Sequence, residues 1–172
     1  IHMEKNPLVS IIMGSTSDLP VMEKAAAFLD SMEVPFEMNA LSAHRTPVEV
    51  ESFAVHAEER GVKVILAGAG MAAALPGVIA ANTTIPVIGI PIKGMLDGLD
   101  AMLSIIQMPP GIPVATVGVN GAQNAAILAV EMLALSDSQL AGRLKAYKES
   151  LKDKIVKANQ ELSTVRYKNK TN

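Results

Sequence analysis

The stretch Ser42-Ala43-His44-Arg45-Thr46-Pro47 places a hydroxyl, an imidazole and a guanidinium where one predicted element ends and the next begins. Before it, residues 36–41 alternate and are apolar enough to form a short strand. After it, Thr46-Pro47 followed by Glu49 is typical of a helix start with a capping box. The imidazole and the guanidinium are therefore predicted to lie on a tight strand-to-helix turn, where α/β proteins bind ligands.

The rest of the chain alternates short apolar runs with helical patterns, which predicts a parallel sheet covered on both faces. The expected fold is a three-layer α/β sandwich, flavodoxin-like, with a long C-terminal helix. The predicted strands are 8–13, 36–41, 62–67, 87–90 and 114–119. The predicted helices are 19–32, 46–60, 72–82, 99–106, 121–135 and 137–165.

Length and composition fit one globular domain, expected over 4–172, since 172 residues with 49% hydrophobic content can bury a sizeable core. Ile1-His2-Met3 resembles a cloning remnant and is set apart. The absence of cysteine excludes disulfides and thiolate metal sites, and favours a cytoplasmic setting. The most apolar region, 64–92, is interrupted by glycine and proline, so we expect no membrane-spanning segment and no membrane partner.

Charge is distributed unevenly along the chain. Residues 1–142 hold six Lys or Arg against fourteen Asp or Glu, whereas 143–172 hold nine against three. A nucleic-acid partner is not expected, because the main part lacks a basic excess and the chain has only five aromatic residues. The basic segment is interpreted as the solvated face of a helix, whose apolar stripe must cover another surface. That stripe comprises Leu140, Leu144, Tyr147, Leu151 and Ile155.

Three predicted turns, 14–18, 42–45 and 68–70, should converge at the carboxyl edge of the sheet. In the first, Gly14 allows close backbone approach, and the hydroxyls of Ser15 and Ser17 lie near a helix start that favours anions. Simple capping is the alternative for both serines. Asp18 could equally cap the following helix or contact a ligand.

The turn at 42–45 holds the two residues best suited to chemistry. Arg45 offers a fork suited to phosphate, although it could instead pair with a glutamate. A lone loop histidine such as His44 is more often a solvated surface residue, so its neighbours must decide. None of the three turns matches a dinucleotide-binding or P-loop pattern.

Together these segments resemble the PurE family of purine biosynthesis over about residues 8–135, in order and in spacing. The segments that carry the resemblance are Gly14-Ser15-Thr16-Ser17-Asp18, Ser42-Ala43-His44-Arg45-Thr46-Pro47, Gly68-Ala69-Gly70 with Leu75-Pro76-Gly77, and Gln107-Met108-Pro109 with Gly111. The resemblance implies a mutase that converts 5-(carboxyamino)imidazole ribonucleotide to 4-carboxy-5-aminoimidazole ribonucleotide. It implies no metal and no organic cofactor.

The family pattern implies a role for each matching residue. Ser15, Ser17 and Arg45 would bind the 5′-phosphate and Asp18 the ribose hydroxyls. Ser42 and His44 would face the base and the carboxylate. The pocket wall for carbon dioxide would come from the third turn, namely Gly68, Ala69, Gly70, Met71, Ala72, Ala74 and Leu75. Met71 and Ala74 depart from the family, which most often has Gly and His there.

His44 is the expected catalytic residue, because His2 lies in the set-apart remnant and His56 falls within a predicted helix among glutamates. Decarboxylation of the carbamate needs a proton delivered to nitrogen, and rearomatisation after recarboxylation needs one removed. One imidazole can do both near neutral pH.

Two other functions stay open at this point. The first is a direct aminoimidazole ribonucleotide carboxylase that uses free carbon dioxide, although that branch more often resembles Ser-Ala-His-Lys and here Arg45 follows His44. The second is a non-catalytic flavodoxin-like module that binds a nucleotide or a flavin. The resemblance also implies a homo-octamer, in which the Met108–Gly111 turn reaches a neighbour's site.

Overall fold

The computed structural model describes residues 6–172, so the set-apart segment 1–3 lies outside the described residues. Five strands form one sheet in the order β2-β1-β3-β4-β5, and every paired strand is parallel. The strands are β1 Val9–Met13, β2 Phe36–Ala40, β3 Val64–Gly70, β4 Val87–Ile92 and β5 Ala115–Thr116. The helices are η1 Thr16–Asp18, α1 Leu19–Ser31, α2 Pro47–His56, α3 Leu75–Ala81, α4 Leu99–Ile106, α5 Ala122–Ala134 and α6 Ser138–Thr164.

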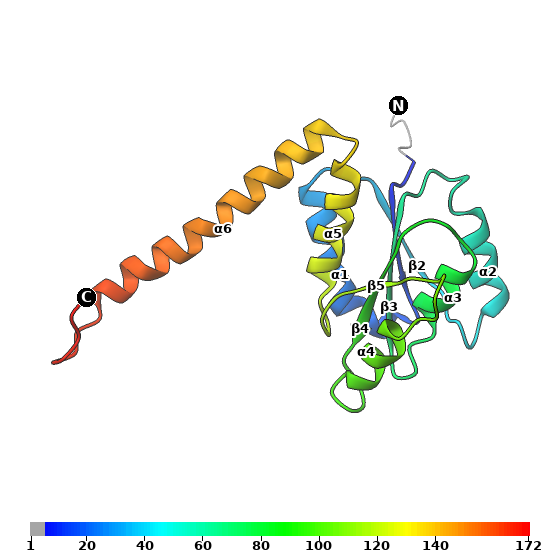
Figure 1. Ribbon diagram of the computed structural model, residues 1–172, viewed down its shortest axis with the longest axis horizontal. Helices are drawn as coiled ribbons and strands as arrows, with labels where there is room; N and C mark the ends of the chain where they lie inside the picture. The colour runs from blue at the N-terminus through cyan, green and yellow to red at the C-terminus, as the bar shows by residue number, and fades with distance from the viewer. Residues whose placement is uncertain (1–5) are drawn as a thin grey trace.

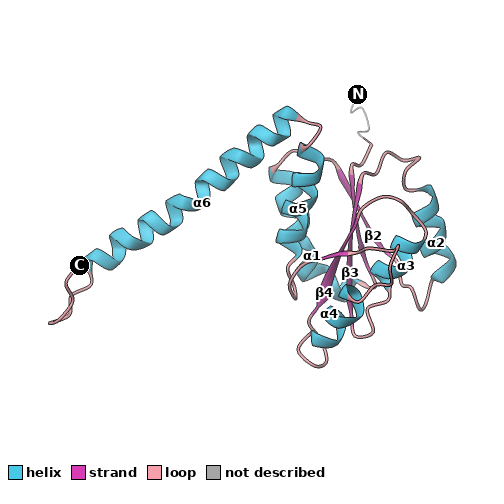
Figure 2. Cartoon of the chain, viewed as in Figure 1, coloured by secondary structure: helices cyan, strands magenta, loops and turns pink. Residues whose placement is uncertain are grey.

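Helices cover both faces of this sheet, as the continuous apolar strands predicted. Figure 2 shows α1 and α5 on one side of the strands and α2, α3 and α4 on the other. Alternate strand residues serve the two layers: Val9 and Ile11 pack toward α1 and α5, whereas Ile12 packs toward α2 and α3. The predicted three-layer, flavodoxin-like α/β fold is therefore confirmed.

The one polar residue within β1, Ser10, is fully buried on the α2 side. Its hydroxyl donates a 2.8 Å hydrogen bond to the Glu37 carboxylate on the neighbouring strand. That carboxylate also pairs with Arg60 at 3.0 Å. A polar residue is accommodated in a buried strand because its hydroxyl has a partner.

The C-terminal helix was predicted to cover a surface along its whole stripe, and it does so only at its start. Leu140 and Leu144 are buried against α5 and α1, and Tyr147 packs on Phe28 with its ring 4.9 Å away. Beyond them, Leu151 and Ile155 are 43% and 65% exposed. In Figure 1 the rest of α6 extends away from the sheet as a free arm.

Several predicted boundaries are corrected by the structure. The second predicted helix ends at His56 instead of Arg60, and residues 57–61 form a turn. The predicted strand 114–119 shortens to β5, since only Ala115 and Thr116 pair with β4. None of the helices in residues 6–172 has the length and hydropathy needed to cross a bilayer.

Candidate active site

A pocket of about 360 Å³ lies at the carboxyl edge of β1, β2 and β3. Because the strand order is 2-1-3-4-5, the chain leaves β1 toward one side of the sheet and β3 toward the other, and such a switch point is where open α/β sheets bind ligands. The lining residues are Gly14, Ser15, Ser17, Asp18, Ser42, Ala43, His44, Arg45, Ala69, Gly70, Met71, Ala73, Ala74 and Leu75. The three polar and small-residue segments singled out in the sequence thus share one pocket.

In the first turn, the capping interpretation holds for one serine and not for the aspartate. Ser15 precedes η1, and its hydroxyl accepts a 3.3 Å hydrogen bond from the Ser17 N–H. The two serine hydroxyls also contact each other. Asp18 stands at the N-cap position of α1 but makes no capping hydrogen bond. Its carboxylate is therefore available to a ligand.

Burial raises the pKa of the Asp18 carboxyl above its ordinary value of 3.8, and a hydrogen bond from Ser17 opposes part of that rise. A carboxylate held in a partly desolvated site costs free energy in the ligand-free protein. Hydroxyl groups of a ligand could donate to the Asp18 carboxylate the hydrogen bonds that it has lost from water.

In the second turn, Arg45 joins two strand ends. Its Nη2 donates to the Gly14 carbonyl at 2.9 Å, and its Nε lies 3.4 Å from the Ser42 hydroxyl oxygen, which also accepts from the Arg45 N–H at 3.2 Å. The alternative pairing of Arg45 with a glutamate does not occur within residues 6–172. The guanidinium is instead positioned beside the first turn, near the N-terminal end of η1.

Thr46 was predicted to cap α2 with its side chain, and this is wrong. Its Oγ1 accepts from the Ser42 N–H at 2.9 Å and donates to the Ser42 carbonyl at 3.1 Å. The Thr46 N–H donates to the same carbonyl at 2.8 Å. The hydroxyl is engaged in closing the turn, so it cannot also cap the helix. His44 projects from this closed turn and is exposed at the pocket.

The third turn lies later in the chain than predicted. Residues Gly68-Ala69-Gly70 end β3, because each pairs with β4, and the turn follows at 71–74. Gly68 does not reach the pocket: a Cβ there would lie 2.7 Å from the Met22 sulfur of α1. Ala72 is exposed and also lies outside the pocket lining.

Two lining residues escaped the sequence prediction. Ala43 lies inside the quoted motif but carries no reactive group, so nothing singled it out. Ala73 is 4% exposed and has a φ of +43°. In an alanine-rich sequence, nothing marks one alanine as buried or as having a positive φ.

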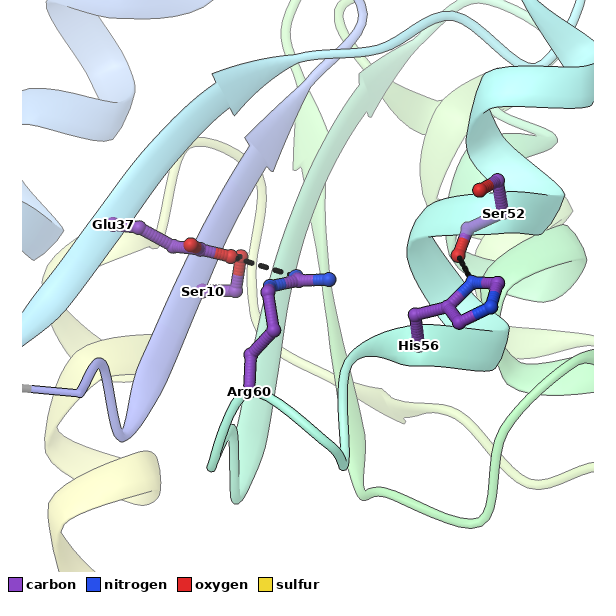
Figure 3. Close-up of polar contacts among 5 residues, drawn as sticks. All are labelled: Ser10, Glu37, Ser52, His56 and Arg60. Carbon is purple, nitrogen blue, oxygen red and sulfur yellow. Dashed lines mark hydrogen bonds and ion pairs between the residues drawn. The ribbon is translucent and has the colours of Figure 1, made fainter.

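A larger hollow of about 690 Å³ lies elsewhere, between β2 and α2. Figure 3 shows its polar groups: Glu37 points toward Arg60, and the His56 ring faces the main chain of Ser52. The His56 Nδ1 lies 2.8 Å from that carbonyl oxygen. These groups are paired with one another within the hollow, whereas His44 and Asp18 face an open pocket. The smaller pocket is the better candidate site.

Comparison with known proteins identifies the family of the chain. A family model described as AIR carboxylase, where AIR denotes aminoimidazole ribonucleotide, matches residues 8–154. The chain belongs to the AIR carboxylase family. This confirms the resemblance to PurE proteins predicted from the motifs.

Members of this family with assigned names are close in sequence. The N5-carboxyaminoimidazole ribonucleotide mutase of Pyrococcus abyssi is 60% identical over 147 residues, which cover 85% of this chain and 84% of that protein. The enzyme of the same name from Pyrococcus horikoshii is 51% identical over 167 residues, 95% of this chain and 94% of that one. The crystal structure of Treponema denticola PurE matches with a TM-score of 0.82 at 33% identity, covering 91% of this chain and 98% of the other.

Proposed function

We propose that this AIR carboxylase family member acts in purine biosynthesis and converts N5-carboxyaminoimidazole ribonucleotide to 4-carboxy-5-aminoimidazole ribonucleotide. The observation that carries the proposal is the convergence of His44, Arg45 and Asp18 on one 360 Å³ pocket. The names of relatives at 51% and 60% identity support the same reaction. They favour neither the direct carboxylase nor the non-catalytic module.

The pocket offers groups suited to each part of this substrate. Arg45 and the hydroxyls of Ser15 and Ser17 would bind the 5′-phosphate, because a guanidinium fork and donors at a helix start both suit phosphate oxygens. The Asp18 carboxylate would accept the ribose hydroxyls. Ser42 would then face the base, and the pocket residues of the third turn would surround the transferred carbon dioxide, namely Ala69, Gly70, Met71, Ala73 and Ala74.

His44 would supply both proton transfers. As the bond between the exocyclic nitrogen and the carboxylate breaks, carbon dioxide leaves and the nitrogen takes a proton. Ring carbon four then attacks the carbon dioxide and forms a carbon–carbon bond. Loss of the proton on that carbon restores aromaticity, so one proton is delivered and one is removed.

An isotope experiment separates the mutase from the carboxylase. Carbamate substrate labelled in its carboxylate is supplied in excess unlabelled bicarbonate, and the label in the product is measured. A mutase should keep most of the label, because carbon dioxide held beside the ring needs no second diffusional encounter. Extensive loss of label, or efficient synthesis from aminoimidazole ribonucleotide at low bicarbonate, would instead favour the carboxylase.

The proposed working form is a cytoplasmic homo-octamer, in which the Met108–Gly111 turn reaches a neighbour's pocket. Two apolar surfaces support an assembly of copies. Leu99, Leu103 and Ile106 are 57%, 45% and 55% exposed along one side of α4. The free arm of α6 adds the exposed stripe described above, and its basic residues complement the acidic excess of 1–142. Light scattering at micromolar concentration should give an octamer mass, and a monomer would contradict this.

A further inference from the structure

The turn between β3 and α3 holds two ordinary residues in a backbone conformation that favours glycine. Met71 has a φ of +52° and Ala73 a φ of +43°. An L-residue in this region is less favourable than in the right-handed form, because its Cβ lies too close to the following carbonyl oxygen. Such a cost is retained where the surrounding structure, or a function, fixes the residue. The Met71 side chain is 64% exposed, so packing in the protein core does not account for it.

Met71 also differs from the other exposed side chains that line the pocket. Its neighbours there are small, as at Gly70 and Ala74, or polar. Leu75 is the other large apolar residue, and at 3% exposure it is fixed within the core. Met71 is therefore the one long apolar side chain at the pocket, within the described part of the chain, that has room to change rotamer. A thioether side chain with three rotatable bonds adapts well to an irregular surface.

Carbon dioxide is the component of the proposed reaction that most needs such a cover. It is small, uncharged and only a weak hydrogen-bond acceptor, so Arg45 and the serine hydroxyls cannot hold it as they would hold a phosphate. Escape into bulk water or hydration to bicarbonate would end the transfer. An apolar side chain that closes over the base excludes water from the space between the broken and the forming bond.

Resting on the mutase function proposed above, we propose that Met71 closes the pocket over the released carbon dioxide and so determines how much of it is recaptured. In this role Met71 retains carbon dioxide in the pocket and takes no part in proton transfer. Because the family most often has glycine at this position, the turn itself accounts for the positive φ, and Met71 adds a side chain to the pocket wall. A change at Met71 should therefore alter label retention more than substrate affinity.

The test is the labelled-carbamate experiment with three substitutions, each in the full chain. Met71→Leu keeps an apolar side chain of similar size and should retain the label as the wild type does. Met71→Gln keeps the length but introduces a polar amide, and Met71→Gly removes the cover. Both should raise the rate of label loss relative to transfer on the order of tenfold, the size of effect expected for one apolar pocket contact. Their KM for the carbamate should change by less.

Thermal unfolding of the same variants separates this role from a structural one. Met71→Gly should unfold no earlier than the wild type, because glycine adopts positive φ without strain. A variant that is more stable and yet leaks carbon dioxide cannot be explained by damage to the fold. Equal label retention in Met71→Gln, Met71→Gly and wild type would overturn the proposal for Met71. Loss of label in the wild type itself would instead overturn the mutase function on which it rests.

Discussion

Turns with positive φ occur at both edges of the sheet, and they differ in what they do. At the amino edge, Glu33 and Gly61 have positive φ just beyond α1 and α2, and hydrogen bonds close both turns: Val34 N–H to the Leu29 carbonyl at 3.0 Å and Val62 N–H to the Ala57 carbonyl at 3.2 Å. At the carboxyl edge, positive φ at Met71 accompanies an exposed side chain that lines a pocket. The same backbone conformation closes a turn at one edge and presents a side chain at the other.

The difference separates residues that stabilise the fold from residues that serve the reaction. Substitutions at the carboxyl edge should reduce activity without destabilising the protein, and those at the amino edge should do the reverse.

The largest effect is expected at His44. His44→Asn should lose on the order of 10²-fold or more in turnover, because asparagine can neither deliver nor remove the two protons. Steady-state assays of carboxylate transfer measure this loss. The unfolding temperature should stay near that of the wild type, since the ring is exposed. Phosphate-dependent ligand binding should also remain, and turnover within a few-fold of wild type would show that His44 is not the proton carrier.

The next largest effect on activity is expected at Thr46, which positions the turn that carries His44. Thr46→Val keeps the shape but removes the hydroxyl that bonds both the N–H and the carbonyl of Ser42. The turn carrying His44 then loses its closure, and a misplacement of about 1 Å can cost up to about 10²-fold in rate, so we expect a fall in kcat on the order of tenfold. Thr46→Ser keeps the hydroxyl and should recover most of it. A merely structural role would lower the unfolding temperature and leave kcat per folded enzyme unchanged.

The fold and much of the pocket could be predicted because strand periodicity and polar turns can be recognised from short stretches of sequence. Leu99–Ile106 forms a helix with the predicted bounds, and His44 lies on the predicted turn. The wrong predictions concern segments whose conformation depends on hydrogen bonds to other residues of the chain. Gly68-Ala69-Gly70 suggests a turn by composition, yet β4 pairs with it and keeps it extended. The Thr46 hydroxyl could cap α2 or bond Ser42, and the turn geometry selects the second.

Asp18 should show a smaller effect, with opposite signs in binding and stability. Asp18→Asn keeps one acceptor oxygen but loses the charge that strengthens hydrogen bonds from the ribose hydroxyls. We therefore expect KM to rise ~5-fold. Burial raises the pKa of the Asp18 carboxyl, which means that the folded protein binds this proton more tightly than the unfolded chain. Stability contributed by this group therefore falls as pH rises from 3.8 through the raised pKa.

Thermal unfolding at several pH values checks that sign. Ligand-free Asp18→Asn should unfold slightly later than wild type at pH 7, where the wild-type carboxylate is charged and partly desolvated. The difference should vanish once the pH falls below 3.8, because both side chains are then neutral. A variant that is less stable than wild type at pH 7 would show that the carboxylate stabilises the fold.

The smallest effect on activity is expected at the amino edge, at Gly61. Its φ is +90°, and a Cβ added there would lie 3.5 Å from the Cβ of Asn6 and 3.8 Å from the Pro7 carbonyl, which is ordinary contact. Gly61→Ala should therefore cost only the backbone term, about 1–2 kcal/mol, or a few degrees in unfolding temperature. Gly61→Asn should cost less, because asparagine tolerates positive φ better than alanine. In both variants kcat and KM per folded enzyme should equal those of the wild type, since the turn lies at the opposite edge from the pocket. A fall in kcat at Gly61 without a fall in stability would mean that the two edges are coupled through the sheet, and the separation of stabilising from functional turns would not hold.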